Sequence, residues 1–417
     1  MSLLLKNVLV LDTNSPAHQQ QANILIEKGL ITSLNGKSAK KEIDLKGHQL
    51  SCGWFDLNAN FNDPGNEHRE DIESGIKVAQ SGGFTDVCLT PDTSPPIESK
   101  SDVNYLIRKG NNAVELYVSA AISEGLNGEG LTEILDLNDA GAVSFSDGDK
   151  PIWNAELLLK ALQYTKNLNT PVIQNAREVN ISRNTHMHEG RMSTNLGLRG
   201  EPSLSEELII QRDIEILRYS GGHLHFSRVS SAKGVDLIKR AKKEGLYITC
   251  DVAIHHLIFT DDSIGEFDTN FKSLPPYRTE KDRKALIKGL KEDVIDAICS
   301  NHRPLDQESK QLEFDLAEPG NISLQTFLPA LLSVSKEISL DILIDKVVNG
   351  PRSILNLQPA SIDVGQEAKL TIFDPKAKWT LNDSTNISKS RNSPFWNKEV
   401  EGKVAGTVNR SYFKINK

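Results

Sequence analysis

The middle of the chain alternates short apolar segments with amphipathic helical patterns, and this alternation limits the possible folds more than any other feature. A strand–helix alternation that recurs through the middle of a chain is typical of a parallel sheet. At 417 residues the chain is long enough to close such a sheet into a (β/α)₈ barrel, which we predict. An open doubly wound sheet is the alternative, but the strand-to-helix turns carry no glycine-rich phosphate-binding motif. The strand-like segments are 84–89, 115–119, 142–145, 171–174, 223–226, 247–252 and 297–299, and helical patterns lie at 154–167, 206–219, 232–244 and 279–292.

The two ends of the chain have a different pattern from the middle. Short alternating segments broken by turns occur near the start and return near the end, which is typical of β meanders. We therefore predict a small β-sandwich domain built from both termini, residues 1–52 and 356–417, and a barrel over residues 53–355. The segments are 6–11, 22–26, 30–34 and 48–50, then 369–373, 379–381, 404–408 and 412–415.

Composition excludes several classes of protein. With 38% hydrophobic and 25% charged residues, the chain is expected to be globular with a large core. Its apolar runs are far shorter than the ~20 residues of a membrane span, and the segment around Lys6 lacks the features of a signal peptide. A net charge of −8 without a basic cluster argues against nucleic-acid binding. We expect a cytoplasmic protein whose four isolated cysteines are reduced and buried.

Six motifs, in order along nearly the whole chain, resemble those of the dihydroorotases of the amidohydrolase superfamily. Residues 53–65 (GWFDLNANFNDPG), with Glu73-Ser-Gly75, resemble the family's GxxDxHxHxREPG and ESG, and residues 83–93 resemble GGxTxVxxMPNT. The later segments 145–148 with 154–156, 224–231, 296–304 and 361–375 resemble FSDDG with NAEL, LHxxHVSS, DAIATDHAP and the tail G-x-DADLxxFDP.

The resemblance implies a barrel with two zinc ions and a role in pyrimidine biosynthesis. Paired metals lower the pKa of a shared water, and the resulting hydroxide attacks the ring amide of dihydroorotate. Histidines at i and i+2 on the first strand reach one ion because strand side chains alternate.

The family's metal-ligand positions fall in this chain on residues that do not bind zinc usefully. Asparagine is a weak neutral donor, and Gly148 has no side chain. The guanidinium of Arg228 is never deprotonated in a protein, so it places a fixed positive charge where the family places two cations. We therefore expect no zinc cofactor and a non-catalytic chain. The six positions are Asn58, Asn60, Gly148, Asn175, Arg228 and Asn301, the last at the general-base position.

The substrate positions implied by the resemblance differ from the family in parallel. Asn62 stands where the family has the arginine that clamps the substrate carboxylate, and Asp92 replaces the asparagine of MPN. Leu305 replaces the histidine after DHAP. Dihydroorotate, an anion, should therefore bind poorly.

Some residues near these positions leave other chemistry open. Asp147 and Asp149 flank Gly148, and we interpret both as turn residues, although either could enter the pocket. His302 with Asp147 is the pair to test first for residual chemistry. A buried Arg228 needs a partner, with Asp92, Asp147, Asp149 or a solvent anion as candidates. Other histidines are expected to be structural, at His225, His255 and His256, or to lie in a surface loop, at His186 and His188.

Three functions follow from this pattern. The first is a scaffold or partner subunit in pyrimidine synthesis, forming a homo-oligomer or associating with aspartate carbamoyltransferase by analogy with the family. The second is an enzyme, either an active dihydroorotase that converts N-carbamoyl-aspartate to dihydroorotate or a metal-free hydrolase. The third is a small-molecule binding protein with Arg228 as an anion clamp.

Overall fold

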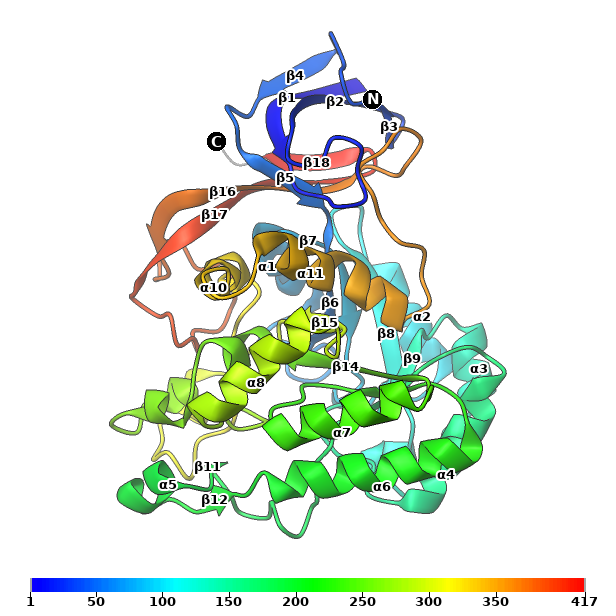
Figure 1. Ribbon diagram of the computed structural model, residues 1–417, viewed down its shortest axis with the longest axis vertical. Helices are drawn as coiled ribbons and strands as arrows, with labels where there is room; N and C mark the ends of the chain where they lie inside the picture. The colour runs from blue at the N-terminus through cyan, green and yellow to red at the C-terminus, as the bar shows by residue number, and fades with distance from the viewer. Residues whose placement is uncertain (1, 416–417) are drawn as a thin grey trace.

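Eight parallel strands form a nearly closed barrel at the centre of the molecule (Figure 1). The computed structural model describes residues 2–415, so residue 1 and residues 416–417 of the predicted β domain lie outside it. An isolated bridge between Ala59 and His302 closes the ring, and the Asn60 N–H donates to the His302 carbonyl at 3.0 Å. The predicted (β/α)₈ barrel is thus confirmed. Its strands, in order, are β6 (Trp54–Ala59), β7 (Phe84–Leu89), β8 (Glu115–Ala121), β9 (Ser144–Ser146), β10 (Val172–Gln174), β13 (Leu224–Phe226), β14 (Ile248–Ala253) and β15 (Ala297–Cys299).

Amphipathic helices surround the barrel and bury their apolar sides against it (Figure 1). In α7 (Ala232–Lys243), Val235, Ile238 and Ala241 are buried, Ser231 caps the N-terminus, and lysines and an arginine lie in the last turn, where they complement the helix dipole. The other surrounding helices are α1 (Ile72–Ser81), α2 (Lys100–Lys109), α3 (Ile134–Asp139), α4 (Ala155–Lys166), α6 (Leu204–Ser220), α8 (Glu280–Lys291) and α11 (Leu340–Ile354).

Shorter elements lie outside this repeat. The strands β11 (Met187–His188) and β12 (Gly200–Glu201) form a two-stranded sheet in the loop after β10. The short helix α5 (Arg191–Leu196) lies between them, and α9 (Gln307–Lys310) and α10 (Phe327–Val334) follow β15.

Strands from both chain ends form a second sheet, which lies above the barrel in Figure 1. The halves join where β5 pairs antiparallel with β16, with Leu50 opposite Ile372. All eight strands belong to one hydrogen-bonded sheet. They are β1 (Ser2–Val10), β2 (Gln21–Glu27), β3 (Leu30–Ser33), β4 (Lys41–Asp44), β5 (Gln49–Cys52), β16 (Lys369–Thr380), β17 (Glu399–Asn409) and β18 (Tyr412–Ile415).

An aromatic cluster joins the two sheets. The buried Trp54, where the chain enters the barrel, lies 5.9 Å from Phe84 of β7 and 5.7 Å from Phe373 of β16, measured between ring centroids. Phe327 of α10 completes the cluster at 6.0 Å from Trp54. Both sheets therefore contribute to one continuous core.

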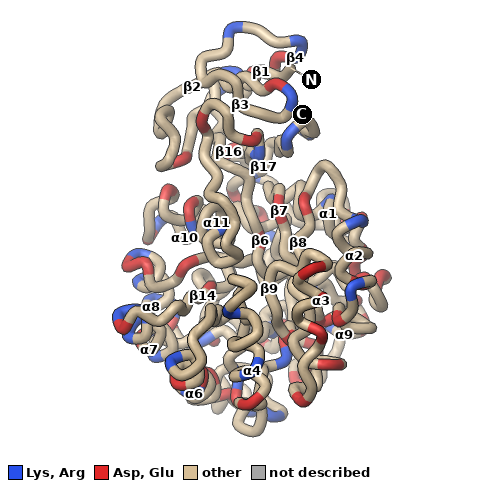
Figure 2. The backbone as a smooth tube through the Cα atoms, turned by 90° about the vertical axis from the view of Figure 1, so that its right-hand side faces the viewer, with Lys and Arg blue, Asp and Glu red and all other residues tan. Residues whose placement is uncertain are grey.

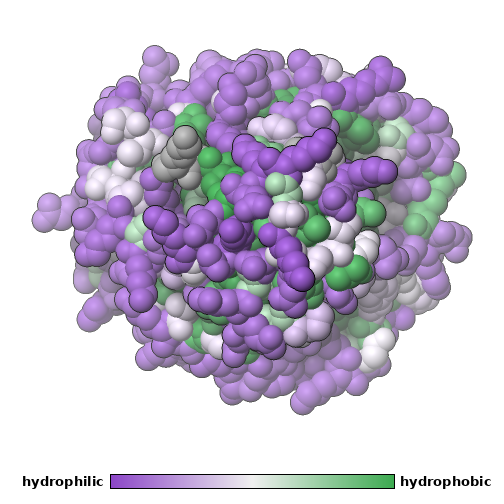
Figure 3. Space-filling view, turned by 90° about the horizontal axis from the view of Figure 1, so that it is seen from above, coloured by the Kyte–Doolittle hydropathy of each residue, from purple (hydrophilic) through white to green (hydrophobic). Residues whose placement is uncertain are grey.

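The surface mixes charges of both signs. Acidic and basic residues are interspersed over α6, α7 and α8 in Figure 2, and hydrophilic residues predominate around scattered apolar ones at the end of the molecule seen in Figure 3. None of the helices described between residues 2 and 415 is long and apolar enough to cross a membrane. The four cysteines are free and buried, as predicted.

Candidate site at the barrel mouth

Arg228 follows β13 and lies buried at the mouth of the barrel, with 2% of its surface exposed. Its Nη1 lies 2.6 Å from Asp149 Oδ1 and donates to Asn301 Oδ1 at 2.7 Å. Both Arg228 (φ 60°) and Asn301 (φ 52°) hold left-handed backbone conformations, which are costly for residues other than glycine. The expected acidic partner of Arg228 is thus Asp149.

A second buried guanidinium extends this ion pair into a cluster. Arg303, in the loop after β15, donates from Nη1 to Asp92 Oδ2 at 2.7 Å and from Nη2 to Asp149 Oδ1 at 2.9 Å. We name Asp92, Asp149, Arg228 and Arg303 the Arg–Asp cluster. It ties together the loops after four barrel strands, β7, β9, β13 and β15.

The electrostatics of the cluster follow from its burial and its opposed charges. Burial alone raises the pKa of Asp149, but the charges of Arg228 and Arg303 outweigh it and hold that pKa below its ordinary value. Burial opposes the charge of Arg303 as well, and Asp149 and Asp92 reverse that effect and raise its pKa. Asp149 is therefore ionised at neutral pH, and the cluster sets two carboxyl groups against two guanidinium groups.

The remaining predicted positions surround the cluster. Asn60 donates from Nδ2 to the Asp92 carbonyl at 3.0 Å, and Asn175 donates to the Asp149 carbonyl at 2.9 Å. Asn58 Nδ2 lies 3.4 Å from Ser227 Oγ, beside Arg228 in sequence. Gly148 adopts φ 65°, and a Cβ there would lie 2.4 Å from Asp92 Cγ, so the Asp92 carboxyl group occupies the space of a larger side chain.

The side chains at these positions do not suit a zinc ion. They offer amides, a glycine and guanidinium groups, whereas zinc sites use thiolates, neutral imidazoles and carboxylates. Across residues 2–415 no three His, Cys, Asp or Glu side chains converge as a metal site. Asp92 and Asp149 are both engaged by guanidinium groups. The donor set therefore does not fit the two zinc ions that the resemblance implies.

Asp149 lies in a turn, as the sequence predicts, and its carboxylate also enters the pocket, where it contacts both arginines. The interpretation of His188 is wrong. His188 was expected in a surface loop, but it lies buried in β11, where Arg278 Nη1 contacts its Nδ1 at 3.3 Å. Burial and the charge of Arg278 lower the pKa of His188 to about 4.

The structure does not pair His302 with Asp147. His302 Nδ1 accepts the Ser323 N–H at 3.1 Å, and its Nε2 faces Glu70 at 3.9 Å. Asp147 instead accepts the Ser123 N–H at 3.0 Å. Each of these candidates for residual chemistry has its own structural partners. His225, by contrast, is hydrogen-bonded as expected, to Thr249 and Asp251.

Each of the three predicted substrate positions contacts other parts of the protein. Asn62 donates to the Pro304 carbonyl at 3.1 Å, and Asp92 is bound to Arg303. Leu305 is buried, and its N–H donates to Asn392 Oδ1 at 3.1 Å.

Arg303 was missed in the sequence. The signal was present, because segment 296–304 has arginine where the similar DHAP motif has alanine. Because this alanine is not a ligand position in the motif, comparison with the motif does not predict that Arg303 belongs to the site.

Solved structures share the architecture of this chain and show its fold class. An L-hydantoinase from Arthrobacter aurescens superposes with a TM-score of 0.88 at 23% identity, covering 100% of this chain and 96% of its own. A dihydropyrimidinase from Brevibacillus agri gives 0.84 at 20% identity, with 100% and 95% covered. The chain therefore shares the barrel fold of these two structures.

Sequence comparison gives the family within this class. A family model described as Dihydro-orotase-like matches residues 47–234. The dihydroorotase of Geobacter metallireducens is 36% identical and that of Aquifex aeolicus 34% identical, each over 98% of both chains. The chain belongs to the dihydroorotase family.

Proposed function

We propose that this chain is a non-catalytic dihydroorotase-family protein that serves pyrimidine biosynthesis as a scaffold or partner subunit. The Arg–Asp cluster is the observation that carries the proposal. Two fixed cations occupy the centre where the family is expected to hold two metal ions, and each is bound to a carboxylate that could otherwise serve as a ligand. The neutral amides around it supply neither a general base nor a nucleophile.

The test is a dihydroorotate ring-opening and ring-closing assay beside metal analysis, after expression in zinc-supplemented medium. The dihydroorotase of Aquifex aeolicus serves as the positive control. We expect activity below about a thousandth of the control and far less than one zinc per chain, because the site has no set of ionisable ligands. Stoichiometric zinc with activity that a chelator removes would refute the proposal.

An active dihydroorotase is the second candidate, because the relatives that match over nearly the full chain carry that name. The same assay distinguishes a zinc-dependent reaction from a metal-free one. Activity that persists without zinc and falls in His302→Gln or Asp147→Asn would favour the metal-free reaction.

The proposed partners are a second copy of this chain or aspartate carbamoyltransferase, by analogy with the family. Size-exclusion chromatography with light scattering, on the chain alone and mixed with the aspartate carbamoyltransferase of the same organism, tests both. A monomer that forms no complex would leave the scaffold role without support.

A further inference from the structure

A cavity of about 480 Å³ opens beside the Arg–Asp cluster. Three segments line most of it, residues 177–187, 272–276 and 315–319. Leu274 lies between the cavity and the Arg–Asp cluster. It lines the cavity, and its carbonyl accepts a hydrogen bond from Arg228 Nη1 at 3.4 Å. None of the predicted metal or substrate positions lines this cavity.

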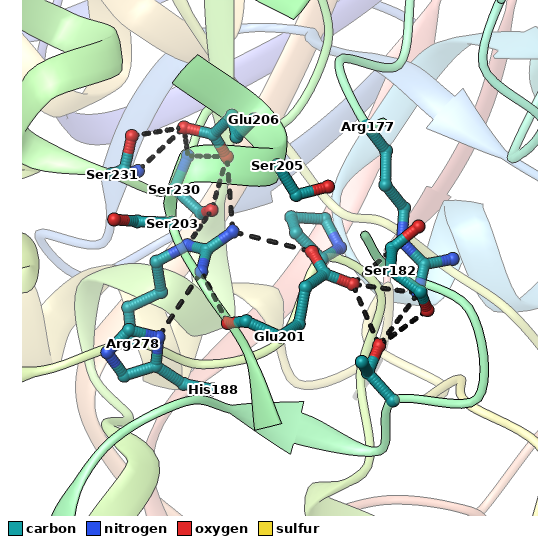
Figure 4. A network of polar contacts seen from close by, with 12 residues as sticks. Arg177, Ser182, His188, Glu201, Ser203, Ser205, Glu206, Ser230, Ser231 and Arg278 are labelled. Atoms are coloured by element: carbon teal, nitrogen blue, oxygen red, sulfur yellow. Dashed lines mark hydrogen bonds and ion pairs between the residues drawn. The ribbon is translucent and has the colours of Figure 1, made fainter. Parts of the chain in front are cut away.

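Glu201, one of the acidic residues that line the cavity, is paired with two arginines, as Figure 4 shows. Glu201 lies 2.7 Å from Arg177 and 3.6 Å from Arg278. Arg278 also lies 3.8 Å from Glu206, so two guanidiniums face two carboxylates. Glu318, at another edge of the cavity, accepts two hydrogen bonds from Arg69, both of 3.1 Å. These carboxylates therefore contribute little repulsion toward an anion.

Two cations in the wall are not neutralised in this way. Lys272 is 6% exposed, and its Nζ donates to the carbonyls of Phe314 at 2.7 Å and Asp315 at 3.0 Å, which solvate its charge without cancelling it. Arg183 is exposed and forms no ion pair within the described part of the chain. Apart from the paired Glu201 and Glu318, Asp315 is the only carboxylate among the residues that line the cavity, and it is exposed.

His186 lies beside Lys272 in the lining of the cavity. His186 Nδ1 lies 3.4 Å from Lys272 Nζ. Burial lowers the pKa of His186 most, and the charge of Lys272 lowers it further. Asp315 opposes this with a smaller effect, and Arg199 adds the smallest lowering. Apolar side chains complete the wall, with Val179 39% and Leu316 64% exposed, beside Met187 and Pro276.

We propose that this cavity binds a small organic monoanion, with its carboxylate beside Lys272 and Arg183 and its apolar body against Val179 and Leu316. Two cations facing one carboxylate leave a single positive charge to be matched, which selects a monoanion over a polyanion. The exposed apolar side chains provide the burial that gives such a ligand affinity. The inference does not depend on whether the chain is catalytic.

Phenylacetate and its uncharged isostere phenylacetamide are the probes, measured by isothermal titration calorimetry on the full chain. We expect phenylacetate to bind about tenfold more tightly, and Arg183→Gln to remove most of that preference. Arg191→Gln is the matched control, because Arg191 is exposed nearby but does not line the cavity. It should bind phenylacetate like the parent.

Leu316 provides a second test that leaves the fold undisturbed, because its side chain is exposed. Leu316→Glu adds a carboxylate at the cavity and should weaken phenylacetate binding about tenfold, whereas the neutral Leu316→Gln should weaken it much less. Equal affinity for the two probes, no binding of phenylacetate, or parent-like binding by both Arg183→Gln and Leu316→Glu would each overturn the proposal.

Discussion

A guanidinium group buried at the position of a metal ligand needs carboxylates nearby to balance its charge. Arg228 is nearly fully buried, and a buried cation without a partner is strongly destabilising. Asp149 supplies that partner, and Arg303 balances the remaining charge by bridging Asp149 to Asp92. The buried guanidinium of Arg228 thus depends on residues from several other loops.

Arg228→Met should destabilise the fold at pH 7 by about 2 to 3 kcal/mol, less than a fully broken buried pair, because Arg303 still contacts Asp149. The pKa of Asp149 is lowered in the folded protein, so the ion pair stabilises the fold above about pH 4, and this contribution is lost as the pH falls through the lowered pKa. Urea unfolding of parent and variant should therefore show a difference that is full at pH 7 and narrows at acid pH. An equal difference at every pH would contradict this account.

Gly148→Ala should destabilise the protein far more than an ordinary glycine substitution in the same backbone conformation. Gly148 and Gly197 have nearly equal φ angles, 65° and 64°, but a Cβ at 148 meets Asp92, whereas one at 197 meets nothing within 4 Å. Gly197→Ala should cost about 1 kcal/mol of backbone strain, and Gly148→Ala about 2 kcal/mol more from overpacking. Thermal unfolding of the two variants measures the stability that each substitution removes. Equal losses of stability would mean that Asp92 moves aside at no cost.

Single site residues could be predicted from the sequence where they fall on a functional position of a recognised motif. Arg228 stood out because it falls on a histidine of a recognised motif. Turn propensity correctly places Asp149 in a turn, but it is local and does not give the direction of the side chain. Only the fold brings Asp92 and Arg303, 211 residues apart, within hydrogen-bonding distance.

Helices and strands with a regular pattern of apolar residues could be predicted from the sequence. Those with few apolar residues could not. The strand pattern at 84–89 agrees with β7, and the helical pattern at 232–244 agrees with α7. In α2, only Val103 and Leu106 are buried, which is too few to give a clear period. The two-residue strands β11 and β12 carry no period at all, which is why His188 was misplaced.

Glu206 of α6 holds the loop that precedes α7. Its carboxylate accepts the N–H groups of Ser230 and Ser231, at 3.1 Å and 2.8 Å, and both serine hydroxyls. Glu206→Gln removes acceptor capacity from this buried position, so we expect a loss of about 2 kcal/mol. Hydrogen exchange at the amides of Ser230 and Ser231 should accelerate more than at the amides within α7.

The adjacent Glu207 provides the control on the same helix, since it pairs with Lys233, whose side chain is 63% exposed. Glu207→Gln should change stability by less than about 0.5 kcal/mol and leave the exchange of both serine amides unaltered. Equal effects of the two substitutions would refute the proposed role of Glu206.

At the scale of the whole molecule, the terminal sheet and the barrel are joined by buried ion pairs as well as by the aromatic cluster. Asp86 of β7 is fully buried and contacts Arg352 of α11 at 2.9 Å and Lys369 of β16 at 2.5 Å. The alternation in the sequence predicted two β-rich ends, but nothing in it indicated that a barrel carboxylate would bind the first residue of the returning strand.

Asp86→Asn should therefore lower the stability of both sheets together, by about 3 kcal/mol, because Arg352 and Lys369 lose their buried counter-charge. Glu115→Gln is the matched control at the same junction. Glu115 also contacts Lys369, at 2.6 Å, but its side chain is 35% exposed, so its loss should cost less than about 1 kcal/mol. Differential scanning calorimetry should show a single transition in the parent, with equal calorimetric and van't Hoff enthalpies, and a single transition at lower temperature in Asp86→Asn. Two transitions, of which only one moves, would show that the sheets unfold independently and that the shared core does not couple them.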